Sequence, residues 1–156
     1  MPAPSKEPDG VRPAAAAGLY YPRDADGLRC ALETLLGSGG KTAARLPKAL
    51  VVPHAGYAYS GAVAASAFRT LASAAAASIR HVVLLGPSHR VRMRGLALPS
   101  CNYFSTPIGQ VRVNDPGRPR LRELGLAGIA GAPHALEHSL EVPLPFLQPL
   151  LTEFDL

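Results

Sequence analysis

The stretch that decides the fold is Leu50-Val51-Val52-Pro53-His54-Ala55-Gly56-Tyr57, and it has an echo in His81-Val82-Val83-Leu84-Leu85-Gly86-Pro87-Ser88-His89. Each stretch is a short apolar run, rich in β-branched residues, that ends in a turn residue and then a histidine. Because polar residues do not alternate with the apolar ones, each run is typical of a strand that is covered on both faces. We predict two core strands, at residues 48–52 and 81–85.

A helix is predicted between these two strands, over residues 61–72, with Ser60 able to cap it. Strand, helix and strand together form one βαβ unit, whose crossover makes the strands parallel. The carboxyl ends of both strands then lie at one edge of the sheet, where open α/β sheets bind their ligands. We therefore expect His54 and His89, which follow the two strand ends, to lie close together.

The rest of the chain continues the alternation of helices and strands. Four leucines between residues 28 and 36 form one apolar stripe and predict a helix over residues 24–36. Further strands are expected at residues 95–98, 110–114 and 128–132, and further helices at 116–125 and 139–151. The strand at 110–114 alternates polar and apolar residues, so we expect it to be half-exposed and antiparallel. Together these elements predict an α/β fold with a mostly parallel central sheet.

The two ends of the chain carry different signals. Residues 1–13 contain four prolines and no periodicity, so we expect a flexible tail followed by one domain over residues 14–156. At the other end, Phe154–Leu156 is similar to the start of a further strand. We therefore expect the domain to be cut short at the C-terminus.

Composition limits the classes of protein to consider. The 156 residues are 47% hydrophobic and 17% charged, which is typical of a globular domain. No apolar run is long enough to cross a membrane, and residues 1–10 lack the apolar core of a secretory signal, so a cytoplasmic location is expected. The net charge of +5 comes mainly from arginine, densest at Arg90, Arg92 and Arg94. Because no aromatic residues interleave with these arginines, we favour a solvent-exposed face over nucleic-acid binding.

His54 and His89 are the residues most indicative of function. Neutral imidazole is a common ligand for iron, copper and zinc. A single histidine after a strand is usually a hydrogen-bonded turn residue, but two at equivalent strand ends favour a shared metal ion. We predict both as metal ligands.

Other polar residues have two interpretations each. His138 and Glu141 are three residues apart at the start of a predicted helix, so they share a face. They are candidates for acid–base catalysis, further ligation or support of a ligand, and equally for a capping residue and a solvated carboxylate. Tyr57, Ser88 and Tyr103 are candidates to line a pocket near the histidines, although each tyrosine is equally able to serve in packing.

Common catalytic motifs do not occur in the sequence. The residues around Ser88 do not form a G-x-S-x-G elbow, so we do not expect a serine hydrolase. Neither a G-x-G-x-x-G fingerprint nor a phosphate-binding P-loop is present, so nucleotide binding has no motif to support it. His81, at a strand start, and His134, in a loop, are expected to be structural.

Four short motifs occur in order along the chain: Pro53-His54-Ala55-Gly56-Tyr57, Leu85-Gly86-Pro87-Ser88-His89, Thr106-Pro107-Ile108-Gly109 and Glu137-His138-Ser139-Leu140-Glu141-Val142. In this order they resemble the Memo (MEMO1-like) family, also called the AmmeMemoRadiSam system protein B group. The segment from Gly18 to Pro22 is similar to the opening of that family. The resemblance covers nearly the whole chain after the tail.

This resemblance implies a fold and a metal site. The family is similar in fold to class III extradiol dioxygenases of the LigB type, which implies a three-layer α/β sandwich around a non-haem iron site. His54 and His89 match two of its metal-binding pocket residues, whereas a further histidine and a cysteine come from a C-terminal part. Neither Cys30 nor Cys101 stands at that cysteine's position. The chain therefore resembles an N-terminal portion, with an incomplete site for iron or copper.

Two functions follow from the resemblance. The first is a metal-dependent redox or oxygenase-like protein, although dioxygenase activity is not a general property of the family. The alternative is a non-catalytic binding or accessory module that holds a small molecule or a peptide in the same pocket. Bacterial relatives are often associated with a radical-SAM enzyme, so such an enzyme is an expected partner.

Overall fold

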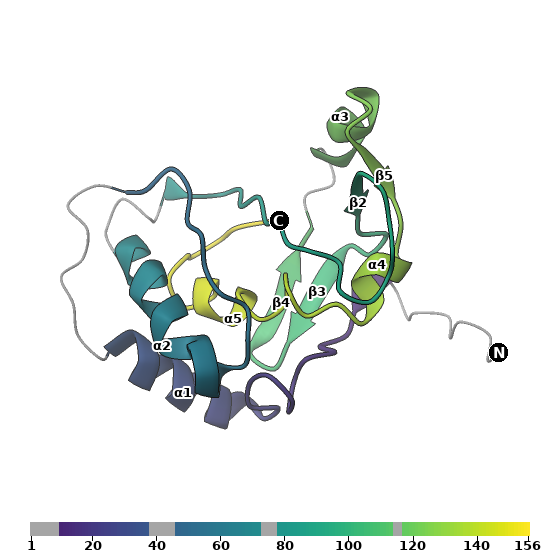
Figure 1. Cartoon of the computed structure of the whole chain (residues 1–156). Coiled ribbons are helices and arrows are strands. Elements are labelled where there is room, and N and C mark those ends of the chain that lie inside the picture. The colour runs from purple at the N-terminus through teal and green to yellow at the C-terminus, as the bar shows by residue number, and fades with distance from the viewer. Residues whose placement is uncertain (1–9, 38–45, 73–77, 114–116) are drawn as a thin grey trace.

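The computed structural model describes residues 10–37, 46–72, 78–113 and 117–156. Figure 1 shows how helices and strands are arranged along this part of the chain. In chain order the elements are β1 (Val11–Arg12), α1 (Ala25–Gly37), α2 (Tyr57–Phe68), the 3₁₀ turn η2 (Arg69–Leu71), β2 (Leu96–Leu98), β3 (Tyr103–Thr106), β4 (Gly109–Arg112), α3 (Gly117–Glu123), β5 (Ala127–Ile129), α4 (Ala132–Ala135) and α5 (Leu144–Leu147).

Most of the strand pairings are parallel. β1 pairs with β3 in parallel, β3 with β4 antiparallel, and β2 with β5 in parallel. Near the C-terminus, Asp155 forms parallel bridges to His81 on one side and to Arg112 on the other. The predicted α/β class with mostly parallel pairing is confirmed, and Asp155 begins to pair where a further strand was predicted.

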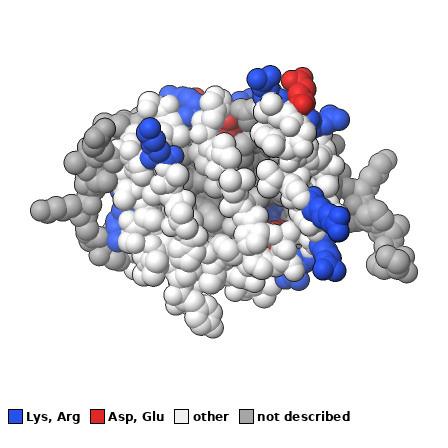
Figure 2. Space-filling view, turned by 45° about the horizontal axis from the view of Figure 1, so that its top comes forward, with Lys and Arg blue, Asp and Glu red and all other residues white. Residues whose placement is uncertain are grey.

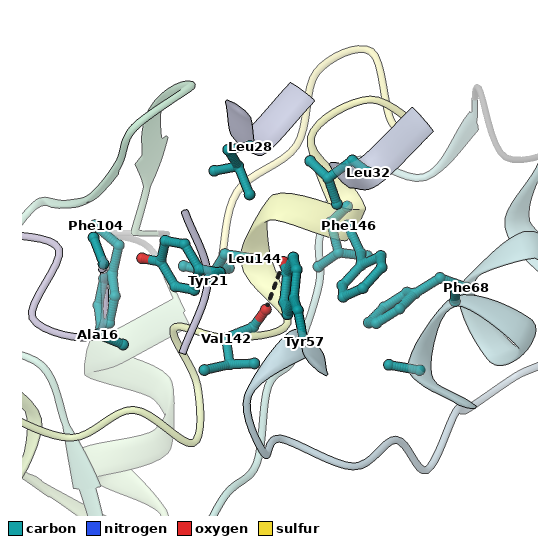
Figure 3. Close-up of a cluster of buried hydrophobic side chains, with 14 of the residues drawn as sticks. Ala16, Tyr21, Leu28, Leu32, Tyr57, Phe68, Phe104, Val142, Leu144 and Phe146 are labelled. Carbon is teal, nitrogen blue, oxygen red and sulfur yellow. Dashed lines mark hydrogen bonds between the residues drawn. The ribbon is translucent and has the colours of Figure 1, made fainter. Parts of the chain in front are cut away.

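Helices α1 and α2 lie side by side and pack on the core of the chain (Figure 1). Leu28 of α1 is fully buried, and Phe68 of α2 stacks on Phe146 of α5 with ring centroids 5.1 Å apart (Figure 3). The Tyr57 hydroxyl donates a hydrogen bond of 3.2 Å to the Val142 carbonyl. Burial of each large apolar side chain stabilises the fold by about 1.5–3 kcal/mol. The start of α2 is therefore firmly anchored in the core.

The prediction of two core strands covered on both faces is wrong. Residues 48–52 contain no strand, and residues 81–85 pair through a single bridge to the C-terminal segment. Val51, Val83 and Leu85 are 98%, 83% and 77% exposed, while their neighbours in the sequence pack against the core. An apolar run indicates that both faces suit burial, but it does not specify which elements pack against each face.

Most other elements agree with the prediction to within a few residues. The predicted elements near 24–36, 95–98, 110–114, 116–125 and 128–132 correspond to α1, β2, β4, α3 and β5. β4 is antiparallel to its neighbour β3, as expected, although β3 itself lies in a stretch for which we predicted no strand.

The helices α2 and α5 differ more clearly from the prediction. α2 begins at Tyr57 with Gly56 at its N-cap, so Ser60 lies in the first turn instead of capping the helix. The helix predicted over 139–151 is reduced to α5, and turns precede it. Prolines at positions 143, 145 and 149 explain this reduction, because proline cannot donate the backbone hydrogen bond that continues a helix.

Part of the predicted N-terminal tail belongs to the folded domain. Residues 1–9 of the predicted tail lie outside the described residues, whereas Val11–Arg12 of the same stretch form β1. Arg12 is 1% exposed, so this short strand belongs to the packed domain. Among the described residues, no helix is both long enough and apolar enough to cross a membrane.

Candidate metal centre

Three histidines from separate parts of the chain converge: His54, His89 and His138. One ligand atom from each can be chosen so that all three lie within 4.8 Å of one another. The ring centroids are 5.3 Å apart for His54 and His89, 5.7 Å for His54 and His138, and 4.7 Å for His89 and His138. The predicted juxtaposition of His54 and His89 is confirmed, and the structure adds His138 to them. We call these three residues the histidine cluster.

The start of α2 fixes the position of His54. The Tyr57 amide, three residues on, donates a hydrogen bond of 2.7 Å to the Tyr20 carbonyl. Gly56 lies so close to the same segment that an added Cβ would be 3.4 Å from the Tyr20 carbonyl oxygen. The Ser60 hydroxyl donates to the Ala55 carbonyl at 3.1 Å. The turn that carries His54 is therefore held both by its own helix and by the segment before α1.

Gly86 allows the segment of His89 to approach the segment of His138. An added Cβ at Gly86 would lie 2.9 Å from both Ser139 Oγ and Leu140 Cδ2, too close for any other residue without movement. The Ser139 hydroxyl donates a hydrogen bond of 2.8 Å to the Pro87 carbonyl across this contact. A glycine at this position therefore allows the two segments that carry these histidines to pack closely.

The buried carboxylate of Glu137 joins the same two segments. Its Oε2 accepts the backbone amide of His89 at 2.6 Å, and its Oε1 lies 2.9 Å from His89 Nδ1. Oε1 also accepts the backbone amides of His138 and Ser139, at 2.9 and 3.0 Å. When Nδ1 of His89 carries the proton of this bond, Nε2 is the nitrogen with a free lone pair for a ligand.

The surroundings shift the pKa values of Glu137 and His138 downward, which favours an ionised carboxylate beside a neutral His138 imidazole. Burial by itself would raise the pKa of Glu137, but hydrogen bonds from the His89 ring and from the Ser139 and His89 amides outweigh it and lower the pKa to about 2. Burial lowers the pKa of His138; the Glu137 carboxylate opposes this effect, and coulombic interactions with His89, His54 and Arg90 add to it. A neutral imidazole is the form that binds a metal ion.

His138 has the surroundings expected of a ligand. Its ring stacks on Tyr20 with centroids 4.3 Å apart and planes 25° apart. Its Nδ1 is buried and has no hydrogen-bond partner among the described residues, although Glu137 Oε1 lies 3.3 Å away. Buried polar atoms are normally paired, so an unpaired ring nitrogen within this cluster fits a position for a bound ion. The donor set of three imidazoles suits iron, copper or zinc.

Comparison with known proteins agrees with the motifs. The family described as Memo-like protein matches residues 12–156. The chain belongs to the Memo-like family. It is 37% identical over 138 residues to a MEMO1 family protein of Aquifex aeolicus, 36% over 157 residues to one of Thermotoga neapolitana, and 34% over 138 residues to the Protein memo-1 homolog of Caenorhabditis elegans.

The Memo-like chain spans only part of each of these relatives. The matches cover 88%, 94% and 88% of this chain, but 49%, 56% and 38% of the respective relatives. The chain therefore spans about half the length of the curated bacterial relatives it matches. A match to part of each relative does not by itself assign the activity or the partners of a whole Memo protein to this chain.

Glu141, predicted as a catalytic candidate with His138, is engaged elsewhere. It is fully buried, and its Oε2 lies 2.5 Å from Nη1 of Arg12. Its carboxylate also accepts the backbone amides of Ala15 and Ala16, at 3.0 and 2.8 Å, and the Tyr21 hydroxyl. Each of the two carboxylate oxygens therefore accepts two hydrogen bonds. The carboxylate stabilises the buried packing of the fold, and this geometry does not support a role in acid–base catalysis.

The three predicted pocket residues lie in three different surroundings. Tyr57 is buried against Phe146, with ring centroids 4.8 Å apart. The Ser88 hydroxyl donates a hydrogen bond of 2.7 Å to the Val91 carbonyl and so stabilises a turn beside His89. Tyr103 lines a separate open cavity of about 750 Å³ that none of the three clustered histidines lines.

The structure adds two residues to the site that were not predicted from the sequence. Tyr20 and Glu137 both contact the histidine cluster, yet neither was singled out by the sequence analysis. Glu137 directly precedes His138 in a motif of the family, which was the available signal. The remaining histidines are structural, as expected: His81 pairs with Asp155 at 2.6 Å, and His134 lies 3.0 Å from the Ala97 carbonyl.

Proposed function

We propose that this Memo-like chain contributes His54, His89 and His138 to a mononuclear iron or copper site with a redox or oxygenase-like role. The observation that carries the proposal is the convergence of three imidazoles whose ligand atoms lie within 4.8 Å of one another. The histidines come from three separate segments, so local sequence spacing does not explain their meeting.

The chemistry of the residues supports a transition metal ion. Imidazole nitrogens suit iron, copper and zinc, and a set of three protein ligands leaves coordination positions open for water or a substrate. Iron or copper would supply one-electron chemistry when bound. Histidine ligands usually donate their other ring N–H to a carboxylate or carbonyl, and His89 has this contact with Glu137 at 2.9 Å.

Metal titration of the purified chain tests the site. Fe(II) without oxygen, and separately Cu(II), would be added, and bound metal measured by mass spectrometry after gel filtration. We expect about one ion per chain, and at least about tenfold weaker binding for each of His54→Ala, His89→Ala and His138→Ala. His81→Ala is the matched control, because it removes an imidazole that pairs with Asp155 outside the cluster. Equal metal content in the wild type and in the triple alanine variant would refute the site.

The redox role needs its own test. Oxygen consumption by the metal-loaded protein would be followed with ascorbate as the reductant, in the wild type and in His89→Ala. A redox site predicts consumption that depends on His89 and exceeds that of free metal. A protein that binds metal but consumes no oxygen under these conditions would favour the alternative role, an accessory module that binds a small molecule or a peptide.

A further inference from the structure

Tyr20 contacts two of the three segments that carry the histidine cluster. Its ring stacks on the His138 ring, with centroids 4.3 Å apart and planes 25° apart. Its carbonyl accepts a hydrogen bond of 2.7 Å from the amide of Tyr57, the first residue of α2, three residues after His54. The side chain and the backbone of one residue therefore reach two segments that lie far apart in the sequence.

Stacking holds the His138 ring where a hydrogen bond at Nδ1 does not. Among the described residues this Nδ1 has no hydrogen-bond partner, although Glu137 Oε1 lies 3.3 Å away. The ring instead stacks on Tyr20 and on His89, at centroid distances of 4.3 and 4.7 Å. Because the torsion that turns an imidazole is broad, a flat ring against its face limits the rotation. Of the two stacking partners, only Tyr20 lies outside the histidine cluster.

The turn that carries Tyr20 is closed by its own hydrogen bonds. The amides of Leu19 and Tyr20 donate to the Ala16 carbonyl at 3.1 and 2.9 Å, and the Gly18 amide donates to the Tyr21 carbonyl at 2.7 Å. Gly18 has a φ of 83°, a left-handed conformation that glycine adopts without steric cost. Tyr20 therefore has little freedom to move apart from this turn.

Glu141 anchors the same turn to the segment of His138. Its carboxylate accepts the amides of Ala15 and Ala16, at 3.0 and 2.8 Å, and the Tyr21 hydroxyl. Burial, followed by this hydrogen bond, raises the pKa of Tyr21, so the hydroxyl stays a donor at neutral pH. Since Glu141 follows His138 by three residues, the turn and the His138 ring share one support.

We propose that Tyr20 is a positioning residue of the metal site. Its ring sets the plane of the His138 imidazole, its carbonyl holds the turn of His54, and Glu141 keeps Tyr20 in place. Tyr20 acts through these two histidines and is not itself a ligand. The inference rests on the proposed function, because positioning matters only for histidines that bind metal. Since the two contacts use the ring and the backbone carbonyl, phenylalanine should replace Tyr20 without loss.

Cu(II) is a suitable probe because carboxylates are sparse in this chain. The sequence contains 11 Asp and Glu residues against 16 Lys and Arg residues. Figure 2 shows few Asp and Glu side chains on the face that it draws. Added Cu(II) therefore meets few carboxylate ligands that would compete with the histidine cluster.

Substitutions that keep or remove the ring test the proposal. Cu(II) affinity would be measured by isothermal titration for the wild type, Tyr20→Phe and Tyr20→Leu. We expect Tyr20→Phe to bind as tightly as the wild type and Tyr20→Leu to bind at least about tenfold more weakly, as is typical when a residue that orients a ligand is lost. Tyr103→Leu is the matched control, because Tyr103 is 37% exposed and lines the separate cavity.

Nuclear magnetic resonance of the metal-free chain gives a second measurement. The ring signals of His138 sense a stacked aromatic ring, so they should move in Tyr20→Leu and stay in place in Tyr20→Phe. The ring signals of His81, which pairs with Asp155, should not change in either variant. The melting temperature of Tyr20→Leu should fall by less than about 4 °C.

The possible outcomes separate this inference from the proposed function. Wild-type affinity in Tyr20→Leu, with weaker binding in His138→Ala, would overturn the positioning role and leave the metal site intact. Equal loss of affinity in Tyr20→Phe and Tyr20→Leu would overturn it too, because the ring would not be the group that matters. A melting temperature lowered by more than about 10 °C in Tyr20→Leu would overturn it in favour of a purely structural role. If the wild type binds no Cu(II), the proposed function fails, and unmoved His138 signals in Tyr20→Leu would overturn the positioning role separately.

Discussion

The carboxylate of Glu137 makes two contacts with a single residue, His89. The His89 backbone amide donates to Oε2 at 2.6 Å, and its ring Nδ1 lies 2.9 Å from Oε1. Because both contacts involve one carboxylate that is itself 5% exposed, they hold the backbone and the ring of His89 at the same time. The rotation of the imidazole is therefore fixed before any ligand arrives, and its Nε2 is kept available.

Glu137→Gln should weaken metal binding while the chain stays folded. The amide has the shape of the carboxylate, but it carries no charge and its nitrogen cannot accept the hydrogen bonds that now come from the His89 and His138 segments. Loss of such a supporting carboxylate typically costs about 10–100-fold in metal affinity. Isothermal titration with Fe(II) or Cu(II) measures the change, with the exposed Glu153→Gln as control. An unchanged affinity in Glu137→Gln would show that the carboxylate does not orient the ligand.

Acid should remove the stabilisation that Glu137 provides. Its pKa is lowered from 4.5 to about 2 in the folded chain, so its contribution to the free energy of unfolding is fully present above pH 4.5 and is lost as the pH falls toward 2. A shift of this size corresponds to at most about 3 kcal/mol at neutral pH. Urea unfolding without metal should show a difference between wild type and Glu137→Gln that shrinks by more than about half between pH 7 and pH 3. A difference that stays constant with pH would contradict the assignment.

The meeting of His54 and His89 was predicted correctly, although residues 48–52 form no strand and residues 81–85 pair only through one bridge. The prediction came from two apolar runs that each end in a turn and a histidine, and the two ring centroids are 5.3 Å apart. The same reasoning did not give the correct carboxylate. Helical spacing pointed to Glu141, because a helix was expected from residue 139, whereas prolines reduce that helix to Leu144–Leu147.

The role of Glu137 and the exposure of Val51 and Val83 could not be predicted from local sequence patterns, because both are set by contacts between distant parts of the chain. The role of Glu137 arises from amide and ring donors 48 residues away in the chain. Val51 and Val83 are 98% and 83% exposed, and an apolar sequence alone does not specify which elements pack against it. Patterns in the sequence therefore predicted the segments and the edge on which the histidines lie, but not the long-range contacts that orient the histidines.

Arg12→Met should destabilise the chain strongly without removing any histidine of the cluster. Arg12 is 1% exposed, donates from Nε to the His134 carbonyl at 2.7 Å, and lies 2.5 Å from Glu141. Removal of one partner of a buried ion pair leaves the other charge uncompensated, which costs about 3–5 kcal/mol. Urea unfolding measures this loss. Arg29→Met is the control, because its ion pair with Asp26 is exposed and should matter little. A loss below about 1 kcal/mol for Arg12→Met would mean that Glu141 finds another partner.

Gly86→Ala should separate the segments that carry His89 and His138. The added Cβ would lie 2.9 Å from Ser139 Oγ and Leu140 Cδ2, so these side chains or the segment that carries them must move. Overpacking of this kind typically costs about 1–3 kcal/mol in the free energy of unfolding, and the displacement should also weaken metal binding. Gly128→Ala is the matched control, because an added Cβ there meets no atom within 4 Å. Urea unfolding and metal titration of both variants test the argument, and a Gly86→Ala protein that binds metal as tightly as Gly128→Ala would show that the site tolerates movement of these segments.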